Sequence, residues 1–229
     1  STFQAFLLAM VLHPEIQKKA QEHVDQAFAG LDRLPDFTDL PIKLPYIDAL
    51  VKELLRWHPV TPIGMYIRLS SLLVSWLNLF LAIPHSVTQE DQYKGYRIPE
   101  NATIIPNIWA VTQDPELYGP NPQEFDPTRF LNADHTDINP DRASGSDVFS
   151  YGRRVCAGSH IALDSIWLVV VSVLRTFNLR EADGERESNP KFGVFTPALV
   201  SHPYPFKIEI VPRSSAAEAL IRQSASNAN

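Results

Sequence analysis

The sequence predicts a mainly α protein of the α+β class, in which helices are accompanied by small antiparallel sheets. Three segments carry apolar residues at helical spacing, whereas the stretches that alternate as strands do are short. Hydrophobic residues make up 45% of the 229 residues and charged residues 20%, a composition that can bury a sizeable core. The formal charge of −6 and the lack of a basic stripe argue against a nucleic-acid partner.

The first apolar stripe indicates a helix at the start of the chain. Its members recur at i, i+3, i+4, i+7 and i+8, and are Phe3, Phe6, Leu7, Met10 and Val11. We expect this helix to reach about His13, where Pro14 begins a second helix that ends near Gly30. No initiator methionine or helix cap precedes the stripe, so we expect the chain to be a piece of a longer protein.

Two further helices are predicted on either side of a long irregular region. Residues 46–57 keep the helical period, and the prolines and glycine of HPVTPIG end that helix. The stretch SHIALDSIWLVVVSVLRTF, residues 159–177, predicts another strongly apolar helix. Residues 114–147 are dense in Pro, Asn, Asp and Gly, and we expect an ordered loop with little regular structure there.

Short strands and a tail complete the expected elements. Residues 93–106 alternate and turn as short strands do. Near the end, PFKIEIV places Phe206, Ile208 and Ile210 on one side, which predicts a half-buried strand with these residues inward. We expect residues 1–212 to form one unit and residues 213–229 to be a disordered tail.

The chain has one cysteine, Cys156, in the stretch FSYGRRVCAG at residues 149–158. A lone cysteine excludes a disulfide framework, and most free cysteines are packing residues. The flanking glycines and arginines make a poor core, however, and a helix that begins directly afterwards favours a thiolate. A nucleophilic cysteine would need a base such as His160, and zinc would need several Cys or His ligands. Haem iron, which one axial thiolate can hold, fits this pattern better.

The pattern Phe149-x-x-Gly152-x-Arg154-x-Cys156-x-Gly158 resembles the haem-binding loop of the cytochrome P450 family, the haem-thiolate monooxygenases. The resemblance implies that Cys156 is the axial ligand of the iron of haem b. It implies that Gly152 and Gly158 let the backbone turn around the sulfur and approach the porphyrin. It also implies that Arg154 pairs with a haem propionate and that Phe149 shields the thiolate.

Two further stretches match the same family. ELLR, residues 53–56, is similar to its E-x-x-R helix, in which Glu53 and Arg56 share one face. FDPTRF supplies Arg129, which the resemblance places with them in a largely buried structural triad. In PHSV, His85 stands where the family often has a basic partner for a propionate. The plainer interpretation of Glu53 and Arg56 is a solvated ion pair on a helix, and that of His85 is a histidine in a surface loop.

The resemblance also implies an activity and its partners. It implies a monooxygenase that receives electrons from NADPH through NADPH–cytochrome P450 reductase, takes O2 and hydroxylates a small apolar substrate. Apolar loops are expected to line the substrate pocket at Val60, Pro62, Ile63, Phe195 and Thr196. The acid–alcohol pair and the membrane anchor of the family are expected before residue 1, so no catalytic residue is assigned. We expect the full-length protein, of eukaryotic and fungal type, on the cytosolic face of the endoplasmic reticulum membrane.

Residues 66–83, YIRLSSLLVSWLNLFLAI, depart from the family pattern. The resemblance implies that PVTPIGM runs almost directly into PHSV, whereas this apolar stretch separates them. It is shorter than the ~20 residues of a spanning helix. A membrane-dipping segment is one interpretation, and translated intron sequence is the preferred one. The alternative function is therefore a non-catalytic remnant, or the product of a faulty gene model, that lacks the distal oxygen-activating helix.

Overall fold

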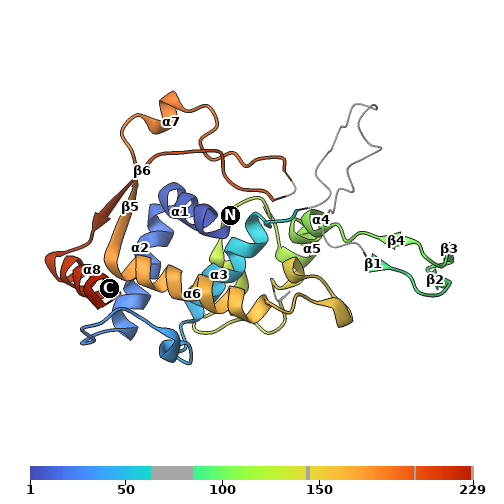
Figure 1. The fold of residues 1–229 in the computed structure, drawn as a ribbon, viewed down its shortest axis with the longest axis horizontal. Coiled ribbons are helices and arrows are strands. Elements are labelled where there is room, and N and C mark those ends of the chain that lie inside the picture. Colours follow the sequence, from blue (N-terminus) through green and yellow to red (C-terminus); the bar gives the residue numbers. More distant parts are fainter. Residues whose placement is uncertain (63–84, 143–144, 199, 228–229) are drawn as a thin grey trace.

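The computed structural model describes residues 1–62, 85–142, 145–198 and 200–227, so the expected insertion at 66–83 lies outside the described residues. Within these ranges the chain is mainly helical with small antiparallel sheets, which confirms the predicted class (Figure 1). The helices are α1 Thr2–Leu12, α2 Pro14–Ala27, α3 Pro45–Trp57, α4 Ile108–Thr112, α5 Pro115–Tyr118, α6 Ser159–Thr176, α7 Glu185–Ser188 and α8 Ser215–Asn227. The strands are β1 His85–Ser86, β2 Asp91–Tyr93, β3 Tyr96–Ile98, β4 Thr103–Ile104, β5 Phe177–Glu181 and β6 Ile208–Pro212.

The main core lies between α1, α2, α3 and α6, the helices that the sequence predicts. Pro14 and Pro45 occupy the first turns of α2 and α3, where the missing N–H of proline has no helical partner to lose. α6 packs against both of these helices (Figure 1), and Leu50, Leu54 and Val170 are fully buried between them. α6 is long and apolar enough to cross a membrane, but the core helices of soluble proteins can have the same length and composition.

The described part of the chain also contains three two-stranded antiparallel sheets. β2 and β3 form a tight hairpin, in which Lys94 and Gly95 take positive φ values of 49° and 84°, as two-residue hairpin turns require. β1 pairs with β4, and both pairs extend away from the helical body (Figure 1). β5, which the sequence does not predict, pairs with β6, and Ile210 is 49% exposed there instead of pointing inward.

Two buried glutamines on α2 support β5. The Gln17 side chain donates to the carbonyl of Leu179 at 3.0 Å and accepts from its N–H at 2.8 Å. Gln21 donates to the carbonyl of Phe177 at 3.0 Å. Side-chain amides of α2 thus pair with backbone groups of β5, as the backbone of a neighbouring strand would.

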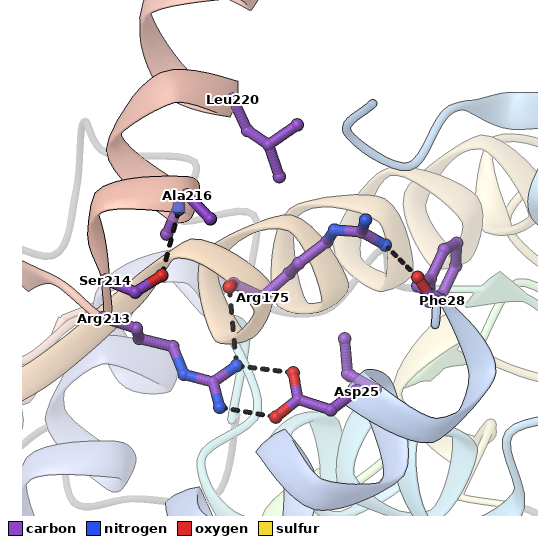
Figure 2. Close-up of a pocket in the computed structure, with 9 residues that line it drawn as sticks. Asp25, Phe28, Arg175, Arg213, Ser214, Ala216 and Leu220 are labelled. Atoms are coloured by element: carbon purple, nitrogen blue, oxygen red, sulfur yellow. Dashed lines mark hydrogen bonds and ion pairs between the residues drawn. The ribbon is translucent and has the colours of Figure 1, made fainter. Parts of the chain in front are cut away.

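The structure corrects the expected disordered tail, because residues 215–227 form α8. Ser214 accepts a hydrogen bond from the N–H of Ala217 at 3.1 Å, and Glu218 pairs with Arg222 one turn later, so the segment has a cap and an internal ion pair. Arg213 binds Asp25 of α2 through two contacts of 2.7 and 2.6 Å (Figure 2). A partly open cavity of about 310 Å³ lies under α8, bordered by Arg175 and Leu220 (Figure 2).

Candidate functional site

Cys156 lies on an exposed loop that directly precedes α6 in the sequence. This cysteine loop, residues 147–158, contains two 3₁₀ turns, Asp147–Phe149 and Gly152–Arg154. The N–H of Cys156 donates to the carbonyl of Phe149 at 2.9 Å, which closes the loop on itself. The carbonyl of Cys156 accepts from the N–H of Ser159, the first residue of α6. The thiol is therefore exposed on a turn whose backbone is fixed at both ends.

Two residues of this loop adopt backbone conformations that favour glycine. Gly152 has a φ of 66°, so the turn needs a residue without a side chain there. Ser150 has φ 72° and ψ −170°, a region that is essentially restricted to glycine. Gly158 has a φ of −87°, which any residue tolerates, and a Cβ there would contact the sulfur of Cys156 at 3.9 Å. The turn itself therefore explains Gly152, whereas Gly158 would have to be explained by close approach of a ligand.

The other residues predicted to bind the cofactor also lie around this loop. Phe149 is half-buried and packs against the core. Arg154 is exposed, and the salt bridges of the described residues involve other arginines. His85 on β1 contacts the hydroxyl of Ser150 at 3.3 Å. The structure thus brings His85 to the loop although it lies 65 positions before Ser150 in the sequence.

The donor chemistry of the site fits iron held within a macrocycle. Among the described residues, no group of three or more His, Cys, Asp and Glu side chains could hold a metal ion. Cys156 therefore offers one soft thiolate, which suits an ion whose other ligands come from a porphyrin. His160 lies exposed in the first turn of α6, and no hydrogen bond between it and Cys156 is present in the described structure.

Glu53, Arg56 and Arg129 form one buried network. The side chains of Glu53 and Arg56 are 0% exposed and contact each other at 2.6 and 2.8 Å. Arg129 donates to the same carboxylate at 3.0 Å, and so does the N–H of Asp126 at 2.8 Å. These donors compensate the burial of the carboxylate.

The remaining guanidinium donors bind backbone carbonyls of the irregular segment 112–131, which we call the meander. Arg56 donates to Thr112 at 2.8 Å and to Pro122 at 2.7 Å. Arg129 donates to Tyr118 at 2.7 Å and to Glu124 at 3.0 Å. The E-x-x-R spacing predicts contact between Glu53 and Arg56, but no sequence signal identifies these carbonyl partners.

The segments expected to line a substrate pocket lie next to each other. The N–H of Ser201 donates to the carbonyl of Val60 at 2.7 Å, and Pro62 accepts from Trp109 at 3.2 Å. Thr196 accepts from the N–H of His202 at 3.2 Å. Ile63 lies outside the described residues.

Phe195 is 8% exposed and packs within the core instead of facing an open surface. Its ring stacks on His58 with centroids 3.4 Å apart and meets Trp57 edge-on. Burial, with a smaller contribution from Arg56, lowers the pKa of His58 to about 4. His58 is therefore neutral near pH 7, and protonation in acid would oppose this packing.

The chain is similar in sequence to several known proteins. The chain is 41% identical to Cytochrome P450 monooxygenase claR of Ampulloclitocybe clavipes, over 97% of this chain and 37% of the relative. It is 38% identical to Cytochrome P450 monooxygenase ppsD of Aspergillus oryzae, over 96% of this chain and 38% of the relative. It is 37% identical to Tryptamine 4-monooxygenase of Psilocybe cyanescens, over 93% of this chain and 38% of the relative. The chain thus spans less than two fifths of the length of these relatives.

A family model described as Cytochrome P450 matches residues 1–71 and 78–210. The unmatched residues 72–77 lie inside the stretch 66–83 that departs from the family pattern. The match covers most of the chain, including the cysteine loop, the buried network and the helical core. The chain accordingly belongs to the cytochrome P450 family of monooxygenases, which are oxidoreductases.

Proposed function

We propose that this chain supplies the haem-binding part of a haem-thiolate monooxygenase that hydroxylates an apolar organic substrate. The observation that carries the proposal is the exposed thiol of Cys156, on a loop whose backbone is fixed in front of α6. The chain offers this single thiolate and no clustered set of other metal ligands among the described residues. That donor set suits haem b, which supplies oxygen activation when it is bound.

Four residues of the loop, and His85 on β1, have proposed parts in holding the haem. Cys156 is the proposed axial ligand, and the hydrogen bond from the N–H of Ser159 to its carbonyl holds it directly before α6. Arg154 and His85 are the proposed partners of the haem propionates. Phe149 shields the sulfur, and Gly152 provides the turn that aims it outward.

The complete reaction requires partners beyond this chain. We propose NADPH–cytochrome P450 reductase as the electron donor and O2 as the oxygen source, on the cytosolic face of the endoplasmic reticulum membrane. The monooxygenase names of the fungal relatives support the reaction class. The apolar character of Val60 and Pro62 supports an apolar substrate.

The ligand assignment predicts a spectroscopic result for Cys156→Ser. The reduced, haem-loaded protein should show the red-shifted carbon monoxide band of a thiolate ligand, and Cys156→Ser should abolish that band because a serine hydroxyl stays protonated. His160→Ala is the matched control and should retain it. A band that survives in Cys156→Ser would exclude Cys156 as the ligand. Rapid labelling of Cys156 by electrophiles, with no haem bound, would instead support a cysteine nucleophile.

A non-catalytic remnant or faulty gene model is the second candidate, and one observation favours it. The family match is interrupted at residues 72–77, within a stretch whose composition resembles translated non-coding sequence. Sequencing the spliced transcript tests this candidate directly. Messenger RNA that lacks codons 66–83 would show that the interruption comes from gene prediction. Mature message that contains them would show that the segment belongs to the protein.

A further inference from the structure

A buried tyrosine touches both arginines of the buried network. Tyr118 ends α5 and is 3% exposed. Its ring centroid lies 5.4 Å from the guanidinium carbon of Arg56, within the range of a cation–π contact. Its carbonyl accepts the hydrogen bond from Arg129 at 2.7 Å. Tyr118 is therefore fixed by the network on its ring and on its backbone.

The hydroxyl of Tyr118 reaches the cysteine loop. It donates to the carboxylate of Asp147 at 2.8 Å. Asp147 begins the 3₁₀ turn that ends at Phe149, and the carbonyl of Phe149 accepts from the N–H of Cys156. A continuous set of contacts thus runs from Arg56 through Tyr118 and Asp147 to the backbone of Cys156.

Asp147 also acts on a residue of the loop itself. Burial, together with the nearby Asp147 carboxylate, raises the pKa of Tyr151 to about 12. Burial and the bond to Asp147 likewise raise the pKa of Tyr118. Both phenols therefore stay protonated as hydrogen-bond donors at neutral pH. The carboxylate thus accepts from a tyrosine of the meander and acts electrostatically on a tyrosine of the loop.

The backbone hydrogen bonds of the cysteine loop are local, so side-chain contacts attach it to the rest of the chain. The backbone bonds include Phe149 to Ser146, Ser150 to Asp147 and Val155 to Gly152, which shape the turns but do not place them against α3. The contact between His85 and Ser150, at 3.3 Å, ties the loop to β1. The Tyr118–Asp147 bond is shorter, ends on a carboxylate and leads to the buried network.

We propose that Tyr118 and Asp147 are positioning residues that hold the cysteine loop in a fixed place relative to the buried Glu53–Arg56–Arg129 network. The consequence for haem rests on the proposed function, because Cys156 then keeps its sulfur where the iron must lie. A buried tyrosine also needs a hydrogen-bond partner simply to be stable. The two roles predict different effects. Loss of a positioning contact should change haem retention by the cysteine loop, whereas loss of a partner for a buried residue should lower the stability of the whole fold.

The test uses the full-length, haem-loaded protein as wild type, Tyr118→Phe, Asp147→Asn and the double variant. We expect each single variant to lose haem to apomyoglobin about ten-fold faster, because a hydrogen bond to a charged group is lost. Each should also retain less of the thiolate-type carbon monoxide band, with little change in the midpoint of thermal unfolding. The double variant should resemble Asp147→Asn, because Tyr118→Phe then removes a donor whose charged acceptor is already gone.

The control variant is Tyr46→Phe, which removes the hydroxyl of another buried tyrosine, stacked on His23 at the far end of α3. It should lose haem as wild type does. Equal haem loss in Tyr118→Phe and Tyr46→Phe, or additive effects in the double variant, would overturn the positioning role.

Failure of the proposed function gives a different result, namely that wild type shows no thiolate band. In that case hydrogen exchange of residues 147–158 in the haem-free protein tests whether Tyr118 and Asp147 hold the cysteine loop. Faster exchange there in Tyr118→Phe supports the attachment, and unchanged exchange overturns it.

Discussion

At Ser150 the backbone adopts a conformation that side chains rarely tolerate. A φ of 72° with a ψ of −170° costs a residue other than glycine about 1–3 kcal/mol. The serine hydroxyl contacts His85 at 3.3 Å, so the residue that carries the strain also links the cysteine loop to β1. A residue that is unfavourable for the local backbone thus contributes a contact between distant segments.

This strain predicts that Ser150→Gly stabilises the fold. Relief of the strain outweighs the greater freedom of glycine in the unfolded chain, so the free energy of unfolding should rise by about 1 kcal/mol. Urea unfolding measures the change. Ser150→Ala is the matched variant, since it keeps the strain and removes the hydroxyl, and it should be slightly less stable than wild type. A Ser150→Gly protein less stable than wild type would contradict the strain argument.

At the scale of single elements, β5 depends on α2 as well as on β6. Gln17 is 5% exposed, and its amide binds both the N–H and the carbonyl of Leu179. The sequence does not predict this contact. β5 follows α6 without an intervening turn signal, and a glutamine on a helix usually faces solvent. The helices were predictable from apolar spacing and prolines, whereas this strand is fixed by distant side chains.

Gln17→Leu should therefore destabilise the protein by about 3 kcal/mol, because two buried backbone groups of Leu179 lose their partner. Gln21→Leu removes a side chain that donates to β5 but accepts nothing from its backbone N–H groups, so its cost should be smaller. Urea unfolding of both variants checks the order. The interpretation fails if Gln21→Leu proves the more damaging of the two.

At the scale of the whole molecule, the sequence predicted the fold class, four helices and the residues around Cys156. It did not predict α8, since a run of small polar residues resembles a mobile tail and the stabilising contact with Asp25 is remote. Nor did it predict Tyr118 and Asp147 as partners, because both fall in an irregular region without periodicity. Local pattern predicted the helices and the motif around Cys156, whereas long-range polar contacts had to be seen in the structure.

α8 should open at a lower free energy than the core. Among its described side chains only Ala217 is buried, and the Arg213–Asp25 pair is partly exposed, which makes such a pair worth about 1 kcal/mol or less. Asp25→Asn should therefore speed hydrogen exchange in α8 and leave α3 unchanged. Glu22→Gln, at an exposed carboxylate on the same helix, is the control. Equal protection of α8 in wild type and Asp25→Asn would show that the ion pair does not hold this helix.

The contacts of Arg56 also bear on the order in which the chain folds. Its guanidinium binds the carbonyls of Thr112, Pro122 and Glu124, in a segment whose own helices are at most one or two turns long. Such a segment has little local structure from which to grow and needs a partner distant in sequence. α3, whose helical hydrogen bonds are local in sequence, can supply that partner through Arg56. The meander should therefore become ordered only after α3 has docked, as a late step of folding.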